Sequence, residues 1–293
     1  MTLAFTSPRS ILFVPADRTD LATKAVGLDC DAVCLDLEDG VAIEAKPAAR
    51  NNLRRLPDQL SKHKPVLIRV NHDLLTCATD LRSIPEVCSA VVLPKVRSPE
   101  HLYLVADALS QIGGNSARRP TPLFAMIEDS RSLHNFATSQ MQLPPIVAGI
   151  ALGAEDLSAD LGCDPASEQI HSCFLTLVRI ARRCNIDAFG FPGAIGNYQD
   201  LDKLNSQVAF SARNGAVGAF CIHPKQIETL NSAFTPSPDD ISRAERIIAA
   251  FETAREDHKG VVSLEGAMID KPVYLRAINT IARSKPFHSQ NSV

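Results

Sequence analysis

The segment AVCLDLEDG at residues 32–40 decides how the fold is interpreted. It begins as an unbroken apolar run and ends in three carboxylates, Asp36, Glu38 and Asp39. A run without polar alternation is typical of a strand buried on both faces of a parallel sheet. In a barrel of such strands, the chemically active side chains lie at the carboxyl ends. The segment therefore predicts a barrel strand that carries acidic groups to a site.

Similar apolar runs occur along the chain, separated by amphipathic stretches that predict helices, such as residues 99–112 and 199–214. The eight runs cover residues 11–16, 32–38, 65–71, 90–96, 122–128, 146–153, 186–191 and 218–223. Eight such units match a barrel, which takes about 250 residues. The predicted class is α/β, a (β/α)8 TIM barrel; a doubly wound open sheet is the alternative.

The pattern changes after Pro236. Residues 239–254 predict a helix, and residues 260–270 form a mixed segment interrupted by glycine. Such a segment can act as a lid or as an arm onto a neighbouring subunit. We expect residues 1–235 to form the catalytic barrel and residues 236–293 to form a C-terminal helix and lid extension.

The overall charge argues for small-molecule chemistry. Lys and Arg number 30 against 33 Asp and Glu, a net charge of −3, so we expect neither nucleic acid nor an anionic membrane as a partner. Residues 1–9 lack the pattern of an export signal, and no segment predicts a membrane span, so a cytoplasmic location is expected. The eight cysteines show no CxxC pair or zinc-ligand spacing, which favours reduced core thiols.

Two acidic residues follow adjacent predicted strands. Glu128 ends the fifth run and Asp156 follows the sixth. Their carboxylates could converge on one divalent cation, and oxygen ligands favour Mg²⁺, with Mn²⁺ as the second choice. Alternatively, Glu128 is an acid at a helix amino end and Asp156 is a helix cap.

A third candidate, Arg69, lies inside the third predicted strand between Ile68 and Val70. An unpaired guanidinium is very costly to bury, so Arg69 must meet an anion. The partner is Asp36 or Glu38 of the preceding strand, a carboxylate or thioester oxygen of a substrate, or both.

Other polar residues have a structural and a functional interpretation. Lys46 and Arg50 are partners for the carboxylate loop or a solvated helix pair. Lys95 could form a Schiff base, but a metal site makes this unnecessary, and we expect an ion-paired or substrate-side cation. His223 is interpreted as a structural residue that caps a loop.

Read together, these segments resemble the citrate lyase β-subunit-like family of the HpcH/HpaI aldolase superfamily. The matching pieces, in order, are residues 9–10, 12–15, 36–40 with Lys46 and Arg50, 68–71, 93–95, 127–128, 153–157, 222–224 with Gln226, and 234–237. The tail GAMIDKP at residues 266–272 looks like the lid of the citramalyl-CoA and malyl-CoA lyase branch.

The resemblance implies Mg²⁺ on Glu128 and Asp156, Arg69 on the substrate, and a homo-oligomer, a trimer or hexamer. It makes Asp270 the catalytic acid/base, acting in the site of an adjacent subunit; without it, Asp270 would be interpreted as a turn residue or helix cap. Asp36 and Glu38 are expected to support Arg69 and metal-bound water beside the substrate.

Two further contacts are implied by the same resemblance. Lys24 would lie near the phosphates of CoA, unless it is a solvated helix residue. The backbone around Ile186 and Asp187 would contact the substrate, unless Asp187 only caps the start of a strand.

The implied reaction is cleavage of a 3-hydroxyacyl-CoA thioester. The leading substrate is citramalyl-CoA, which gives acetyl-CoA and pyruvate, and malyl-CoA, which gives acetyl-CoA and glyoxylate, is the second. The alternatives are a citrate lyase β subunit acting on a citryl carrier protein, a malate-synthase or thioesterase activity, and a scaffold that has lost activity.

Overall fold

The computed structural model describes residues 7–113, 120–256 and 260–284. Residues 1–6, part of the segment considered for export, lie outside this range, as do residues 257–259 and 285–293 of the expected extension. The chain divides into two compact units, one ending at Phe234 and the other beginning at Thr235.

The first unit is built on eight parallel strands with the order β7-β6-β5-β4-β3-β2-β1-β8. A parallel bridge between Phe189 and Gly218 joins the two ends of this order and closes the ring. The strands are β1 Ser10–Pro15, β2 Ala32–Asp36, β3 Val66–Arg69, β4 Ala90–Leu93, β5 Leu123–Ile127, β6 Val147–Leu152, β7 Asp187–Phe189 and β8 Ala219–Cys221. The prediction of a (β/α)8 barrel is confirmed, and each strand lies within or overlaps its expected run.

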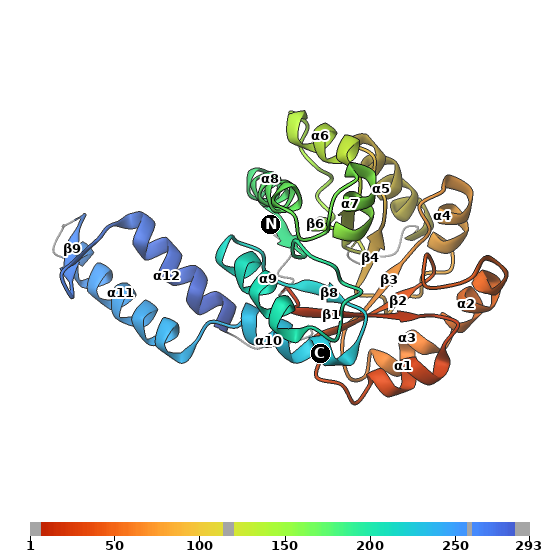
Figure 1. Ribbon diagram of the computed structural model, residues 1–293, viewed down its shortest axis with the longest axis horizontal. Coiled ribbons are helices and arrows are strands. Elements are labelled where there is room, and N and C mark those ends of the chain that lie inside the picture. The colour runs from red at the N-terminus through yellow and green to blue at the C-terminus, as the bar shows by residue number, and fades with distance from the viewer. Residues whose placement is uncertain (1–6, 114–119, 257–259, 285–293) are drawn as a thin grey trace. The chain divides into compact units, whose positions relative to one another are not determined.

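Helices surround the strands (Figure 1). They are α1 Thr19–Ala25, η1 Ile43–Ala45, α2 Lys46–Asn52, α3 Leu56–Leu60, α4 Leu74–Leu81, α5 Pro99–Gly113, α6 Ser130–Thr138, α7 Ala154–Leu161, α8 Glu168–Cys184, α9 Leu201–Arg213, η2 Pro224–Gln226 and α10 Ile227–Phe234. The two helices expected at residues 99–112 and 199–214 correspond to α5 and α9. Gly215, just beyond α9, has φ +106°, a conformation that glycine adopts without strain.

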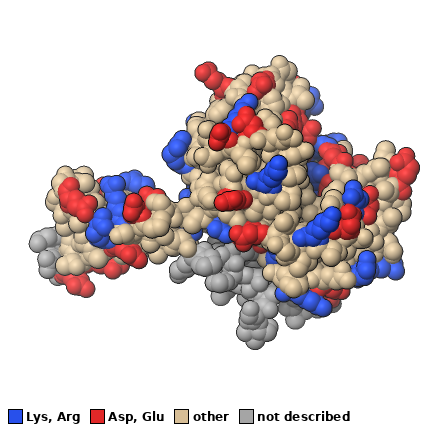
Figure 2. Space-filling view, turned by 60° about the horizontal axis from the view of Figure 1, so that its bottom comes forward, with Lys and Arg blue, Asp and Glu red and all other residues tan. Residues whose placement is uncertain are grey.

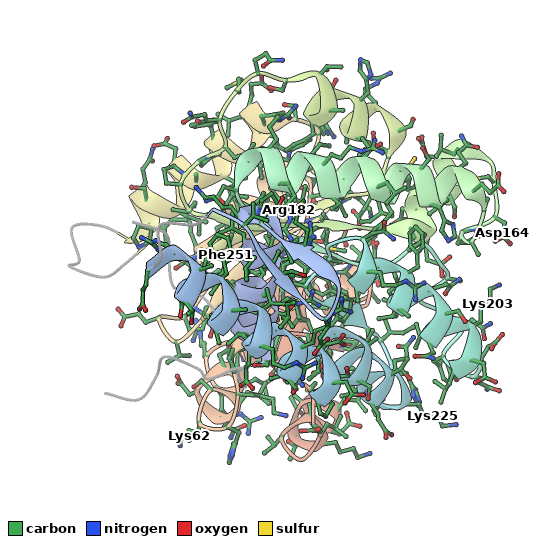
Figure 3. The ribbon with its side chains drawn as sticks, turned by 90° about the vertical axis from the view of Figure 1, so that its left-hand side faces the viewer. Lys62, Asp164, Arg182, Lys203, Lys225 and Phe251 are labelled. Carbon is green, nitrogen blue, oxygen red and sulfur yellow. The ribbon has the colours of Figure 1, made fainter. Side chains whose placement is uncertain are left out.

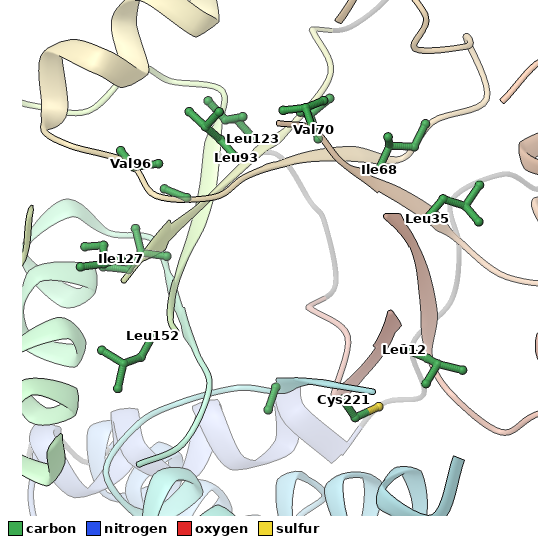
Figure 4. Packing of buried hydrophobic residues seen from close by; sticks show 14 of the residues in the cluster. Leu12, Leu35, Ile68, Val70, Leu93, Val96, Leu123, Ile127, Leu152 and Cys221 are labelled. Atoms are coloured by element: carbon green, nitrogen blue, oxygen red, sulfur yellow. The ribbon is translucent and has the colours of Figure 1, made fainter. Parts of the chain in front are cut away.

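Alternate residues of each strand enter two different apolar layers, as the pleat of a strand requires. One layer fills the inside of the barrel and includes Phe124, Met126 and Phe220. The other lies between strands and helices, and Figure 4 shows its side chains, among them Ile68 and Ile127, outside the ring of strands. Burial on both sides explains why the strands lack polar alternation.

The second unit contains α11 Pro238–Glu256, β9 Val262–Leu264, β10 Ala267–Ile269 and α12 Lys271–Ser284. The strands β9 and β10 pair in an antiparallel hairpin. Its turn has positive φ at both Glu265 (+52°) and Gly266 (+79°), which suits a two-residue hairpin turn. Phe251 and Tyr274 stack with ring centroids 4.7 Å apart and join α11 to α12. The helix expected at residues 239–254 is confirmed; a lid role for this unit remains a prediction.

The surface carries both signs of charge. On the face shown in Figure 2, Lys and Arg are interspersed with Asp and Glu. Among the described residues, no helix is long and apolar enough to cross a membrane. All eight cysteines are free thiols, as expected, and five of them are buried.

Candidate active site

A cavity of about 420 Å³ opens at the carboxyl ends of the barrel strands. Its charged lining comes from residues that end or directly follow strands, and its apolar lining comes mainly from β1, β5, β6 and β8 and the segment after β7. The charged residues are Asp36, Asp39, Arg69, Glu128, Glu155 and Asp156, and the larger apolar ones include Phe13, Met126, Leu152, Phe191, Ile195, Phe220 and Ile222. The structure therefore brings four of the expected site residues, Asp36, Arg69, Glu128 and Asp156, into one pocket.

Arg69 makes the expected ion pair with Asp36. Its Nε and Nη2 donate to the two Asp36 carboxylate oxygens, both at 2.7 Å, and its guanidinium carbon lies 4.4 Å from the centre of the Phe13 ring. Burial alone would lower the pKa of Arg69, but the hydrogen bonds and charge of Asp36 raise it above its usual value. Asp36 also accepts from the backbone N–H of Glu38 and Gly40. The guanidinium is thus held in one orientation and keeps its charge.

Glu38 is only 2% exposed and is surrounded by cationic or polar groups. Its Oε1 accepts from Lys95 Nζ at 2.8 Å and lies 3.1 Å from His72 Nδ1. Its Oε2 lies 3.3 Å from Arg69 Nη1, which is an ion-pair distance without hydrogen-bond geometry. Glu38 therefore pairs with both Arg69 and Lys95, but it does not itself line the cavity.

Lys95 pairs with Glu38 and, at 2.9 Å, with Asp39. Burial would lower the pKa of Lys95, but hydrogen bonds to these two carboxylates raise it above its usual value, so it stays charged. An ion-paired cation is what the sequence predicted for this residue. Lys95 also has φ +48°, a left-handed conformation that costs a non-glycine residue about 1–2 kcal/mol.

Lys46 and Arg50 do not contact the carboxylates of the loop at residues 36–40, and they are not a solvated pair. Lys46 Nζ donates to the backbone carbonyls of Leu37 and Glu38, both at 3.0 Å, and to Asn71. Arg50 pairs at 2.6 Å with Asp80, which is fully buried and also accepts from Asn71. Both cations anchor the loops after β2 and β3.

Glu128 follows β5 and is 5% exposed. Burial raises its pKa to about 7, and the negative charge of Glu38 adds to this effect. Its Oε2 accepts from the backbone N–H of Lys95 at 2.6 Å. A Cβ at Gly153 would lie 2.4 Å from Glu128 Cγ, so only glycine leaves room for this carboxylate. The N-cap of the helix after β5 is Asp129, so Glu128 directly precedes the amino end of α6, and its carboxylate lines the cavity.

Asp156 lies in the first turn of α7, which begins directly after β6. The amino end of a helix favours negative charge. The N-cap of α7 is Gly153, so Asp156 is not the cap residue. The neighbouring Glu155 accepts from the backbone N–H of Gly196 at 3.2 Å and holds the loop after β7.

The donor set fits a hard divalent cation. In the described part of the chain, no group of three or more His, Cys, Asp or Glu residues is arranged to bind a metal. Two carboxylates, one of them buried without an ion pair in this part of the chain, match the way Mg²⁺ is usually held, with water and substrate oxygens as further ligands.

Other predicted site residues do not line the cavity. Lys24 is exposed on the last turn of α1. Ile186 and Asp187 lie at the amino end of β7, opposite the cavity, where Ser7 donates a hydrogen bond to Asp187. The cavity is lined from the carboxyl side of β7 by Gly190 and Phe191 instead. The expected contact at Ile186 and Asp187 is therefore corrected: a strand places its two ends on opposite faces of the barrel.

Asp270 and His223 both act as caps. Asp270 directly precedes α12, and its carboxylate accepts from the backbone N–H of Val273 at 3.1 Å. His223 caps η2, with Lys225 N–H donating to its Nδ1 at 3.2 Å, and it stacks on Tyr198. The structural interpretation of His223 is confirmed.

The apolar wall of the cavity was missed by the sequence analysis, although a signal for part of it existed. Met126 lies two residues before Glu128, and Phe13 two before Pro15, so each shares a strand face with a residue at the mouth. Ile195 and Ile222 lie on loops, where no periodicity marks them.

A closed parallel β/α barrel with a carboxylate-rich cavity at the carboxyl ends of its strands defines a barrel enzyme. The comparison with known families makes this specific. The model of the HpcH/HpaI aldolase/citrate lyase family matches residues 9–224, and the chain belongs to this family of enzymes.

Relatives span nearly the whole chain. A (3S)-malyl-CoA thioesterase of Cereibacter sphaeroides is 30% identical, over 94% of this chain and 94% of the relative. The mitochondrial citramalyl-CoA lyase of Homo sapiens is 30% identical, over 93% of this chain and 84% of the relative. The structure is similar to that of CitE from Mycobacterium tuberculosis in complex with magnesium, acetoacetate and coenzyme A, with a TM-score of 0.75 and 28% identity. The match covers 96% of this chain and 99% of the CitE chain.

Proposed function

We propose that the protein is a Mg²⁺-dependent carbon–carbon lyase that cleaves citramalyl-CoA to acetyl-CoA and pyruvate, with malyl-CoA as a second substrate. The observation that carries the proposal is the placement of Glu128 and Asp156 in the same cavity as Arg69. The magnesium and coenzyme A bound by the similar CitE structure support the cation and the thioester.

The residues divide the reaction between them. Glu128 and Asp156 would hold Mg²⁺, which would polarise the hydroxyl and carboxylate oxygens of the substrate. Because Asp36 occupies the Nε and Nη2 edge of Arg69, the guanidinium is held rigidly at the cavity, where its charge would stabilise the oxygen that becomes negative as the carbon–carbon bond breaks. As the carbon–carbon bond breaks and the 2-oxo acid forms, Asp270 would accept the proton of the substrate hydroxyl and return it to the carbon of the departing thioester, so that no proton is gained or lost overall.

The apolar wall favours citramalyl-CoA over malyl-CoA. The two substrates differ by one methyl group, and Phe13, Phe220 and Ile222 offer it apolar surroundings. A methyl group contributes about 1–3 kcal/mol to discrimination, so the preference is expected to be clear but not absolute.

Hydrolysis of the thioester is the second candidate function, because one relative is a (3S)-malyl-CoA thioesterase. A third is a citrate lyase β subunit acting on a citryl carrier protein, because the family description includes citrate lyase.

One assay separates these functions. The purified chain is incubated with citramalyl-CoA, with and without Mg²⁺, while the 2-oxo acid and free thiol are both measured. Pyruvate that appears only with Mg²⁺ and without free CoA supports the lyase. Free CoA without pyruvate indicates the thioesterase. In a parallel incubation with a citryl carrier protein, turnover of that substrate alone indicates the citrate lyase subunit.

We also propose that Asp270 acts in a neighbouring copy of a homotrimer or hexamer. Glu128→Gln and Asp270→Asn would each be inactive alone. If the site combines two chains, mixing and reassembling the variants would restore about a quarter of the sites. No recovery in a mixed oligomer verified by mass spectrometry would contradict a site shared between subunits.

A further inference from the structure

Lys95 contacts three carboxylates, one that follows β5 and two that follow β2. Its backbone N–H donates to Glu128 Oε2 at 2.6 Å, and its Nζ donates to Glu38 Oε1 at 2.8 Å and Asp39 Oδ2 at 2.9 Å. Main chain and side chain of one residue thus hold carboxylates that follow β5 and β2.

This double contact coincides with an unusual backbone conformation. Lys95 has φ +48°, and the other non-glycine residues with positive φ in the described ranges, Asn185 and Glu265, lie at a helix end and in a hairpin turn. Lys95 lies in neither of these, because it is two residues beyond the end of β4. The next residue, Val96, donates its backbone N–H to Met126 O at 3.1 Å. Left-handed residues outside turns persist only where surrounding contacts hold them.

The contacts of Nζ supply that constraint. Glu38 is held by His72 Nδ1 and Arg69 Nη1 as well as by Lys95, so it is a fixed anchor. Asp39 lines the cavity and gives Nζ a second partner. An ammonium fixed by two carboxylates limits the conformations of its own backbone.

We infer that Lys95 is a positioning residue for Glu128: its ion pairs with Glu38 and Asp39 hold the left-handed backbone whose N–H orients the Glu128 carboxylate for a divalent cation. The inference rests on the proposed function only in that Glu128 binds this cation. Lys95 itself does not line the cavity.

Direct electrostatics and positioning predict opposite results. Removing a positive charge near the site would, through electrostatics alone, strengthen the binding of a divalent cation. Losing the orientation of Glu128 would weaken it, since partners that orient metal ligands contribute 10- to 100-fold in affinity. The direction of the change therefore decides between the two.

The experiment measures binding of Mn²⁺ alone to the full chain, by the loss of the free Mn²⁺ signal in electron paramagnetic resonance. Lys95→Met is expected to weaken binding by about tenfold or more. Lys95→Gly is expected to fall between the wild type and Lys95→Met, because glycine adopts positive φ without strain. Lys95→Arg, which keeps the charge, is expected to bind more tightly than Lys95→Met.

The control is Lys62→Met, at an exposed lysine that points away from the barrel (Figure 3). It removes the same charge and is expected to leave Mn²⁺ affinity unchanged. If Lys95→Met does not fold, as judged by circular dichroism, Lys95→Gln replaces it under the same criteria.

Unchanged or tighter Mn²⁺ binding by Lys95→Met would overturn the inference. Equal losses in Lys95→Gly and Lys95→Met would overturn it as well, because the backbone conformation would then have no part. A wild type that binds Mn²⁺ but cleaves no thioester would defeat the proposed function and leave this inference standing.

Discussion

The two sides of the barrel mouth both carry acidic residues, but they differ in how the charge is neutralised. On the side of β2 to β4, Asp36 and Glu38 are paired with Arg69 and Lys95. On the side of β5 and β6, neither Glu128 nor Asp156 takes part in an ion pair within the described residues, and burial raises the pKa of Glu128 to about 7. The negative charges of the first side are compensated by Arg69 and Lys95. The second side has no such cationic side chain among the described residues, and a bound metal cation would supply the positive charge.

The strongest test removes the charge on the uncompensated side. Glu128→Gln is expected to lower kcat/KM roughly a thousandfold, since the cation would lose one of its two carboxylates. The thermal midpoint of the metal-free chain should not fall, because a buried charge without an ion pair is removed. Activity within tenfold of the wild type would exclude Glu128 as a ligand.

The paired side should respond in stability. Arg69→Met leaves Asp36 and Glu38 without their shared cation and is expected to cost about 3–5 kcal/mol in the free energy of unfolding, measured with urea. Arg69→Lys keeps the charge but cannot make the bidentate contact, and it should lose less. Equal losses in both variants would show that the guanidinium geometry is unimportant.

The contrast should also appear in the pH dependence of the metal-free chain. Burial raises the pKa of Glu128 from its ordinary value of 4.5 to about 7 in the folded state, so the folded state binds more protons between these pH values. This group therefore destabilises the fold progressively as pH rises from about 4.5 to 7, by about 3 kcal/mol at most. Relative to wild type, Glu128→Gln should gain stability over this window and show no further gain above it. A constant difference from pH 4 to pH 8 would contradict the raised pKa.

A smaller effect is expected from the apolar wall, which borders both sides. Ile222→Ser should reduce the preference for citramalyl-CoA over malyl-CoA by about tenfold or less, measured as a ratio of kcat/KM values. Leu104→Ser, an exposed leucine on α5 that does not line the cavity, is the control and should leave the ratio unchanged. An unaltered ratio in Ile222→Ser would remove that part of the wall from the specificity argument.

The smallest effect is expected outside the mouth. Lys24 is exposed on α1 and does not line the cavity, so Lys24→Ala should change the KM for the thioester by about fivefold at most, the scale of an exposed ion pair. A larger increase in KM would support the CoA contact that the resemblance implies.

The order of the strands and the site of the chemistry could be predicted from local patterns. Runs such as residues 32–38 are apolar without alternation, because both faces of a barrel strand are buried. Acidic residues at their carboxyl ends, such as Asp36 and Glu128, would be costly to bury without a paired cation or a bound ligand, so they indicate a site. Both signals lie within a few consecutive residues and need no knowledge of distant neighbours.

The partners of these residues could not be predicted in the same way. Lys46 binds backbone carbonyls of another loop, Gly153 makes room for Glu128, and Lys95 joins Glu128 to Glu38. Phe191, which follows β7, lines the cavity, whereas Asp187 at the start of β7 does not. The direction of the strand in the barrel decides which of its ends faces the cavity. Such contacts join residues 8 to 57 positions apart through the curvature of the barrel, and these pairings depend on the closed ring and not on any local pattern.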